Sequence, residues 1–189
     1  MTQQEFLAQI ARCLEMAGIP FMVTGSYSSS HYGQPRTTND IDVVIDPTPE
    51  QLASFLDLLG DRYYVSKESA HEALSRRSMF NVIDFEDGWK ADLIVRKDRP
   101  FSVEEFRRRT PRTLLGQSLP LASAEDVILA KLEWNALTPS ERQLHDALQV
   151  AVVQWPTLDQ AYLRTWAFAL GVAERLEDLL RKAQELQPK

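Results

Sequence analysis

Two short apolar runs, separated by residues 24–39, place the strongest restriction on how this chain can fold. The first run, residues 20–23, has the composition of a β-strand and is followed at once by a small-residue turn. The second run, residues 41–45, has the same character and begins beside two carboxylates, Asp40 and Asp42. This order predicts a strand, a turn, a short polar crossover, and a second strand that carries two acids at its start.

Asp40 and Asp42 point to one face of the second predicted strand, because side chains alternate along a strand, and they lie roughly 7 Å apart. Carboxylate oxygens suit Mg²⁺, and a paired-metal site holds its ions about 3.5–4 Å apart. Gly25 and Ser26, if they open a helix, provide backbone N–H groups and a hydroxyl for an anion. A phosphate-binding turn near two metal-binding acids indicates phosphoryl or nucleotidyl transfer.

The same residues resemble the nucleotidyltransferase superfamily of the DNA polymerase β type. The likeness rests on Gly25-Ser26, a short helix, and the string Tyr-Gly-x-Pro-Arg-x-Thr-x-Asp-Ile-Asp that follows it. Details of this string are most similar to the minimal bacterial branch that includes the AbiE-type toxins. The resemblance implies that Gly25 and Ser26 hold the β- and γ-phosphates of a nucleotide. It also makes Arg36 a nucleotide-binding candidate that offsets charge in the transition state, the alternative being an ion pair with Asp46 or Asp92.

A β-hairpin is predicted from residues 79–85 and 89–95, because an Asp-Gly turn separates two apolar runs. The second of these strands carries Asp92 between apolar neighbours. A carboxylate inside an apolar strand is costly unless it is paired or binds a metal, so the alternatives are a metal ligand and an acid paired to an arginine. The resemblance implies the metal ligand. Asp40, Asp42 and Asp92 would then form the catalytic and metal-binding triad, with two Mg²⁺ ions.

The chain is helical in pattern from residue 123 to its end. The first helix there resembles the family's Glu-Asp-x-Ile-x-x-Lys-Leu helix and makes Lys131 a candidate triphosphate contact, the alternative being an ordinary surface lysine. Asp146 follows in a motif similar to the family's Arg-x-x-Lys-Asp, and it would orient Lys131 or pair with Arg142. His145 departs from the family, which more often has lysine at this position.

A chain of 189 residues suits one domain, or a core domain with a helical appendage. We expect an α+β fold, in which residues 1–120 form a nucleotidyltransferase-like core with a small mixed β-sheet covered by helices. Residues 121–189 are expected to form a C-terminal helical bundle packed on that core. A hydrophobic content of 44% without a tract of about 18 apolar residues indicates no membrane association. The single cysteine, Cys13, and the lack of a signal-peptide pattern predict a cytoplasmic protein.

The net charge of −6 argues against general nucleic-acid binding but leaves room for a local basic surface. Residues 96–112 carry seven basic and three acidic side chains. Arg107, Arg108, Arg109 and Arg112 have two interpretations: a solvated helix face, or contacts to the phosphates of an RNA or DNA acceptor.

Together these features predict a Mg²⁺-dependent nucleotidyltransferase that moves a nucleoside monophosphate from a nucleoside triphosphate to a hydroxyl acceptor. The acceptor would be an RNA or tRNA end, a protein or a small molecule. In the toxin-like branch it would be RNA, and the protein would have an antitoxin partner. The alternatives are a catalytically inert nucleotide-binding domain on the same fold and an interaction domain whose acids are structural. A histidine-based metal site is not supported, because His31, His71 and His145 lack ligand spacing.

Overall fold

The computed structural model describes residues 1–187 and divides into two compact units. The first unit combines Met1–Thr24 with Thr38–Leu121, and the second combines Gly25–Thr37 with the described residues from Ala122 onward. The segment of residues 25–37 therefore groups with the C-terminal helices, although it lies in the first fifth of the sequence. The predicted division of the chain into residues 1–120 and residues 121–189 stays a proposal. Residues 188 and 189, at the end of the second predicted region, lie outside the described residues.

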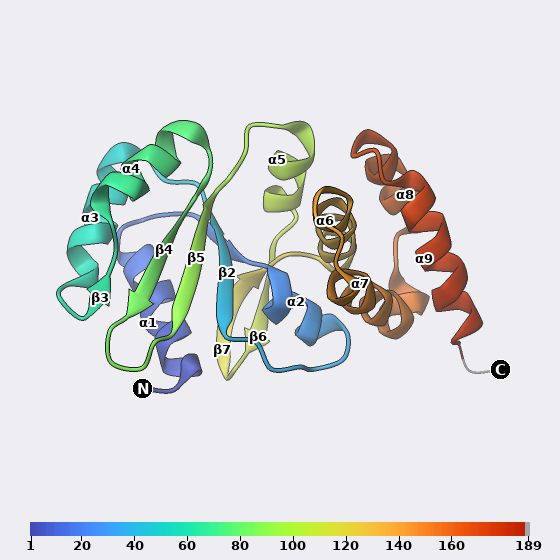
Figure 1. Ribbon diagram of the computed structural model, residues 1–189, viewed down its shortest axis with the longest axis horizontal. Coiled ribbons are helices and arrows are strands. Elements are labelled where there is room, and N and C mark those ends of the chain that lie inside the picture. The colour runs from blue at the N-terminus through green and yellow to red at the C-terminus, as the bar shows by residue number, and fades with distance from the viewer. Residues whose placement is uncertain (188–189) are drawn as a thin grey trace. The chain divides into compact units, whose positions relative to one another are not determined.

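The first unit is built on a mixed seven-stranded sheet with the order β3-β4-β5-β2-β1-β7-β6 (Figure 1). Strand β2 runs parallel to β5 and antiparallel to β1, and β1 runs parallel to β7. The strands are β1 (Phe21–Val23), β2 (Asp40–Ile45), β3 (Tyr63–Tyr64), β4 (Met79–Asp84), β5 (Lys90–Val95), β6 (Thr110–Leu114) and β7 (Gln117–Leu121).

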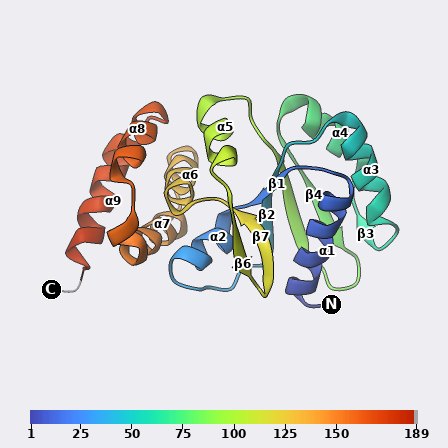
Figure 2. The same ribbon diagram turned by 180° about the vertical axis from the view of Figure 1, so that it is seen from behind.

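Helix α1 covers one face of this sheet, and α3 packs against both α1 and α4. Figures 1 and 2, which are opposite views, both place α1 on the same face of β4 and β5. Ile41, Val43 and Ile45 of β2 are fully buried, whereas the alternate residues of that strand are half-buried. The acids of β2 therefore lie on the face opposite its core side chains. The helices are α1 (Gln3–Met16), α3 (Pro49–Leu59), α4 (Lys67–Arg76) and α5 (Pro100–Arg107).

The second unit is helical, and its short helix α2 packs against α6 and α7. The approach is close at Gly33, where an added Cβ would lie 3.0 Å from the carbonyl oxygen of Ser29 and 3.0 Å from the backbone nitrogen of Val150. A Cβ at this position would press on backbone atoms of α2 and α7, so the absence of a side chain at Gly33 favours this close approach. The helices are α2 (Gly25–Tyr32), α6 (Ala124–Leu137), α7 (Glu141–Gln154), the 3₁₀ turn η1 (Trp155–Thr157), α8 (Gln160–Ala169) and α9 (Ala173–Glu185).

The expected α+β class with a mixed sheet and a helical C-terminal region is confirmed, and so is the hairpin that contains Asp92. The β6–β7 hairpin was not predicted. Its turn places Leu115 and Gly116 at φ values of 49° and 77°. Two positive φ values suit a two-residue hairpin turn, for which Asn-Gly is the usual sequence. The turn was not recognisable in the sequence because its first residue is Leu115 and not asparagine.

Candidate functional site

The first unit presents three carboxylates and one lysine on a single face of the sheet. Parallel pairing of β2 with β5 sets Asp40 opposite Lys90 and Asp42 opposite Asp92. Residues paired across neighbouring strands point to the same side, as do residues two apart on one strand. The four side chains therefore share one face, which we call the carboxylate face. The predicted grouping of the three acids on neighbouring strands is what this register produces.

Lys90 links two of the acids through its ammonium group. Its Nζ lies 3.4 Å from Asp40 Oδ1, and 3.2 Å and 3.3 Å from the two carboxylate oxygens of Asp92. Partial burial by itself would lower the pKa of Lys90, but the hydrogen bond from Lys90 to Asp92 and the charges of both acids raise it above the usual value. Sequence reasoning missed Lys90, although its position two residues before Asp92 on a strand was a usable signal.

Asp92 carries the most buried carboxylate of the face, with the residue only 9% exposed. Its Oδ1 atom is buried and accepts no hydrogen bond from the part of the chain that the structure describes. A buried, charged oxygen without a hydrogen bond is costly, and Lys90 offers it an ion pair. The predicted alternative of an arginine partner for Asp92 is thus replaced by a lysine partner.

The carboxylate face fits a hard cation in its chemistry. Among residues 1–187, no three His, Cys, Asp or Glu side chains are grouped closely enough to form a ready-made metal site. Three acids on one face and the orphaned Oδ1 of Asp92 nevertheless supply oxygen donors of the kind that Mg²⁺ prefers. The predicted metal ligands Asp40, Asp42 and Asp92 stay a prediction.

Gly25 and Ser26 lie at the start of α2, in the second unit. Gly25 has a φ of 61°, in the left-handed region, so glycine permits the turn that follows β1. The Ser26 hydroxyl accepts a hydrogen bond of 2.5 Å from Arg36, and Ser29 donates its own hydroxyl to the Ser26 carbonyl at 3.1 Å. The local turn is therefore held in place by side chains on both sides of it.

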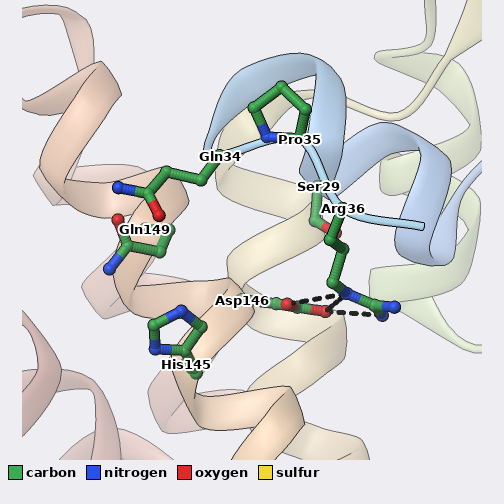
Figure 3. A pocket seen from close by; sticks show the side chains of 7 residues that line it. All are labelled: Ser29, Gln34, Pro35, Arg36, His145, Asp146 and Gln149. Carbon is green, nitrogen blue, oxygen red and sulfur yellow. Dashed lines mark hydrogen bonds and ion pairs between the residues drawn. The ribbon is translucent and has the colours of Figure 1, made fainter. Parts of the chain in front are cut away.

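Arg36 pairs with Asp146, 110 residues further along the chain (Figure 3). Its Nε lies 3.1 Å and 3.2 Å from the two carboxylate oxygens, and a terminal nitrogen lies 3.0 Å from Asp146 Oδ2. The predicted pairing of Arg36 with Asp46 or Asp92 is wrong. Asp46 instead pairs with Arg77 and Arg96. The ion pair of Arg36 with Asp146 depends on which segments of the chain pack together, so a local sequence pattern cannot predict it.

Lys131 reaches the same carboxylate from α6. Its Nζ lies 2.9 Å from Asp146 Oδ2 and 3.0 Å from Gln143 Oε1, and the residue is only 4% exposed. The surface-lysine alternative is therefore wrong, and of the two partners predicted for Asp146, Lys131 is the one observed. Asp146 thus has two cationic partners, Arg36 and Lys131, which we call the Asp146 cluster.

Electrostatics in the Asp146 cluster favour the charged form of Asp146. Burial alone would raise the pKa of Asp146, but hydrogen bonds from Arg36 and Lys131 and their positive charges lower it below the usual value. Two cations therefore share the Asp146 carboxylate, and one of them, Arg36, also reaches the start of α2 at Ser26.

A small cavity of about 70 Å³ adjoins the cluster (Figure 3). Arg36 and Asp146 line it together with His145 and Gln149. This volume holds one or two water molecules and is too small for a nucleotide.

Two of the predicted acceptor-binding arginines, Arg107 and Arg109, contact residues of α5 close to them in the sequence. Arg107 forms a bidentate pair with Glu104 at 2.8 Å and 2.7 Å, and Arg109 stacks on the Phe106 ring with 4.0 Å between its guanidinium carbon and the ring centroid. Arg112 lies on the edge strand β6, whose middle residues are exposed. A contact of these arginines with RNA stays a prediction.

The sheet order and the helical region correspond to the nucleotidyltransferase fold. The solution structure of the antibiotic-resistance factor ANT(2'')-Ia is similar, with a TM-score of 0.60 over 93% of this chain and 97% of that chain, at 11% identity. An antigenic nucleotidyltransferase-like protein from Paracoccidioides brasiliensis is similar as well, with a TM-score of 0.59 over 99% of this chain and 94% of that chain, at 15% identity. A crystal structure of ANT(2'')-Ia in complex with adenylyl-2''-tobramycin gives a TM-score of 0.50 over 98% of both chains, at 17% identity.

Identities this low show a shared fold. Comparison of the sequence with protein-family models and with curated proteins finds no match. The superfamily fold implied by the resemblance is thus supported, whereas the AbiE-type branch stays a prediction. No helix in residues 1–187 is both long and apolar enough to span a membrane.

Proposed function

We propose that this protein is a Mg²⁺-dependent nucleotidyltransferase that moves a nucleoside monophosphate from a nucleoside triphosphate to a hydroxyl group. The observation that carries this proposal is the register of β2 and β5, which sets three acids on one face of a nucleotidyltransferase fold. An interaction domain with structural acids would not need such a concentration of negative charge, because a buried carboxylate lowers stability unless it is compensated.

The three acids share a proposed role as metal ligands, and Asp92 has a second proposed role. Asp40, Asp42 and Asp92 would hold two Mg²⁺ ions. When bound, Mg²⁺ offsets phosphate charge and lowers the pKa of the acceptor hydroxyl. Asp92 provides a buried oxygen without a hydrogen bond, which suits a metal ligand or the acceptor of the hydroxyl proton. The acceptor oxygen then forms a bond to the α-phosphorus as the bond to pyrophosphate breaks.

The second unit supplies the proposed phosphate contacts. The backbone N–H groups of Gly25 and Ser26 at the start of α2 suit the β- and γ-phosphates. Arg36 donates to the Ser26 hydroxyl and so restrains its rotation, while it shares Asp146 with Lys131. Arg36 and Lys131 then contribute positive charge toward the triphosphate.

The acceptor and partners are further parts of the proposal. The neighbouring ANT(2'')-Ia structure holds an adenylylated small molecule, which supports ATP as donor and a small-molecule hydroxyl as one acceptor class. The resemblance to AbiE-type toxins supports an RNA end as the other class, approached through Arg107, Arg108, Arg109 and Arg112, with an antitoxin protein as partner. Incubation with α-phosphate-labelled nucleotide and either total RNA or an aminoglycoside distinguishes the two by which molecule carries the label.

Calorimetric titration of ATP, GTP, CTP and UTP, with and without Mg²⁺, tests the nucleotide site. We expect the wild type to bind at least one of the four when Mg²⁺ is present, and Asp42→Asn to lose that binding, because the variant removes one negative charge from the carboxylate face. Asp57→Asn is the matched control, since Asp57 is an exposed acid on α3 whose partner is Lys67. No binding of any nucleotide at millimolar concentration, with or without Mg²⁺, would overturn the proposal.

One observation favours a second candidate, a nucleotide-binding domain without catalysis. Lys90 already gives Asp40 and Asp92 a cationic partner within the protein. In that case nucleotide binds, but no pyrophosphate is released with any acceptor. A pyrophosphate-release assay on the same preparations separates the two candidates.

A further inference from the structure

We infer that Asp146 is a positioning residue for phosphate binding: acting through Arg36, it fixes the Ser26 hydroxyl as a hydrogen-bond donor toward a phosphate group. This inference rests on the proposed function, in which the start of α2 holds the phosphates of a nucleotide. Beyond the charge that Arg36 contributes there, Asp146 sets the direction of a hydrogen bond. Ser26, Arg36 and Asp146 all belong to the second unit.

The guanidinium group of Arg36 joins the Asp146 carboxylate to the Ser26 hydroxyl. Its Nε lies 3.1 Å from Asp146 Oδ1, and its Nη2 lies 3.0 Å from Asp146 Oδ2 and 2.5 Å from Ser26 Oγ. Figure 3 shows the contact of Arg36 with both carboxylate oxygens. Because the guanidinium group is planar and rigid, the carboxylate that holds one of its edges also sets the position of the N–H group directed at Ser26.

The direction of the hydrogen bond between Arg36 and Ser26 follows from the chemistry of the two groups. A guanidinium group has five N–H donors and no acceptor, whereas a hydroxyl group has one proton and two lone pairs. Ser26 Oγ therefore accepts from Arg36, and its single proton points elsewhere. An ionised phosphate oxygen can only accept a hydrogen bond. A hydroxyl whose proton is already turned away from Arg36 can thus donate to phosphate without first being reoriented, which favours binding.

The segment that carries Arg36 is itself held in place beside α2. The Ser30 hydroxyl of α2 accepts a hydrogen bond of 3.4 Å from the backbone nitrogen of Arg36. Gln154 of α7 donates to the carbonyl oxygen of Tyr32, the last residue of α2, at 2.8 Å. The Arg36 side chain is 28% exposed. Its contact with Ser26 is therefore that of a restrained, partly buried group and not that of a mobile surface arginine.

Both oxygens of Asp146 are needed to hold Arg36 in this orientation. Asp146→Asn keeps the size of the side chain but replaces one acceptor oxygen with an NH₂ donor. Because Nε and Nη2 of Arg36 donate to different carboxylate oxygens, the variant cannot hold both. The Ser26 hydroxyl then loses its fixed donor and its preferred orientation. We therefore expect Asp146→Asn to weaken phosphate binding through its effect on Ser26.

Calorimetric titration with tripolyphosphate in the presence of Mg²⁺ tests this arrangement, because tripolyphosphate has the phosphates of a nucleotide without its base and sugar. We expect Ser26→Ala and Asp146→Asn each to weaken binding about tenfold, which is the usual cost of losing a hydrogen bond to a charged group. The variant with both changes is expected to bind no more weakly than either single variant, because both changes remove the same contact. A merely structural role of Asp146 would make the two losses add.

Tyr162→Phe is the control for the loss of a hydrogen bond elsewhere in the second unit, since the Tyr162 hydroxyl donates to the fully buried Asp126 at 2.6 Å. It is expected to lower the melting temperature and to leave the affinity for tripolyphosphate unchanged. Arg36→Lys is the second variant if Asp146→Asn does not fold. It keeps the positive charge but has one nitrogen in place of the planar fork, and it is expected to bind tripolyphosphate as weakly as Ser26→Ala.

The inference would be overturned, and the proposed function left intact, if the losses in the double variant add. The same holds if Asp146→Asn or Arg36→Lys binds tripolyphosphate as tightly as the wild type, or if the wild type binds a nucleotide but not tripolyphosphate. If the wild type binds neither tripolyphosphate nor any nucleotide, the proposed function fails and the inference fails with it. The nucleotide titration therefore distinguishes the two failures.

Discussion

Asp146 is the carboxylate that Arg36 and Lys131 share in the second unit. It accepts hydrogen bonds from Arg36, in the segment after α2, and from Lys131 on α6, and it is 6% exposed. Breaking a buried pair by removing one partner leaves the other charge uncompensated. The stability of α6 and α7 and the orientation of Arg36 toward Ser26 therefore depend on this one carboxylate.

Asp146→Asn is expected to lower the free energy of unfolding at pH 7 by about 3 kcal/mol, because the buried Lys131 ammonium group loses the carboxylate charge of Asp146. Asp178→Asn, on an exposed helix face with its i,i+4 partner Lys182, is the control and is expected to change stability little. Urea unfolding of both variants measures the difference. Equal stability of Asp146→Asn and the wild type would show that the pair makes no net contribution.

The contribution of Asp146 should also depend on pH. Its pKa is lower in the folded protein than the value near 3.9 expected in the unfolded chain. The folded state therefore binds the proton less readily, so the stabilisation is complete above about pH 5 and is lost as the pH falls through the unfolded and then the folded pKa. Urea unfolding between pH 7 and pH 3 measures the free energy of unfolding of the wild type and of Asp146→Asn. We expect the difference between these two free energies to become smaller below about pH 4. A constant difference would contradict this assignment.

At the scale of elements, β2 and β5 carry the candidate chemistry, because each alternates between the core and the opposite face. Leu93 and Ile41 are buried on the core side, and the acids follow on the other side of each strand. The hydrophobic side of the two strands sets their register, since a slip by one residue would bury the acids and expose the core residues. Core packing thus determines which side chains meet on the carboxylate face.

The turn of the β6–β7 hairpin contains strain that a substitution can remove. Leu115 has a φ of 49°, which costs a residue other than glycine or asparagine about 1 kcal/mol. We expect Leu115→Asn, which restores the Asn-Gly sequence usual for such a turn, to raise the melting temperature by about 2–4 °C. Differential scanning calorimetry measures it. Leu137→Asn removes a more exposed leucine from α6 and is the control, with no gain expected. A lower melting temperature for Leu115→Asn would refute the strain argument.

At the scale of the whole molecule, the two compact units each contain part of the proposed machinery. The first contains Asp40, Asp42, Asp92 and Lys90, and the second contains the start of α2 and the Asp146 cluster. The chain passes from the first unit to the second at Gly25 and back at Thr38, so the predicted motif spans both units. Division of one continuous motif between two units follows from the contacts of α2 with α6 and α7.

Much of this organisation is present in the sequence, because the features concerned are local. The apolar runs and their alternation identified β2, β4 and β5, and placed Asp40 and Asp42 on one side of their strand. The helical pattern from residue 123 onward identified the region that contains α6, α7, α8 and α9. These signals operate within a few residues and need no knowledge of the partner strand or helix.

Contacts between distant residues were decided only by the tertiary structure. The pairing of Lys90 with Asp40 required β5 to lie beside β2 in parallel register, and the pairing of Arg36 with Asp146 required α2 to pack on α7. Both arise when separate elements bury their apolar faces against each other, and the same local pattern is compatible with many such arrangements. The sequence therefore identified the candidate catalytic and binding residues. Their charged partners were determined only by how the strands and helices pack together.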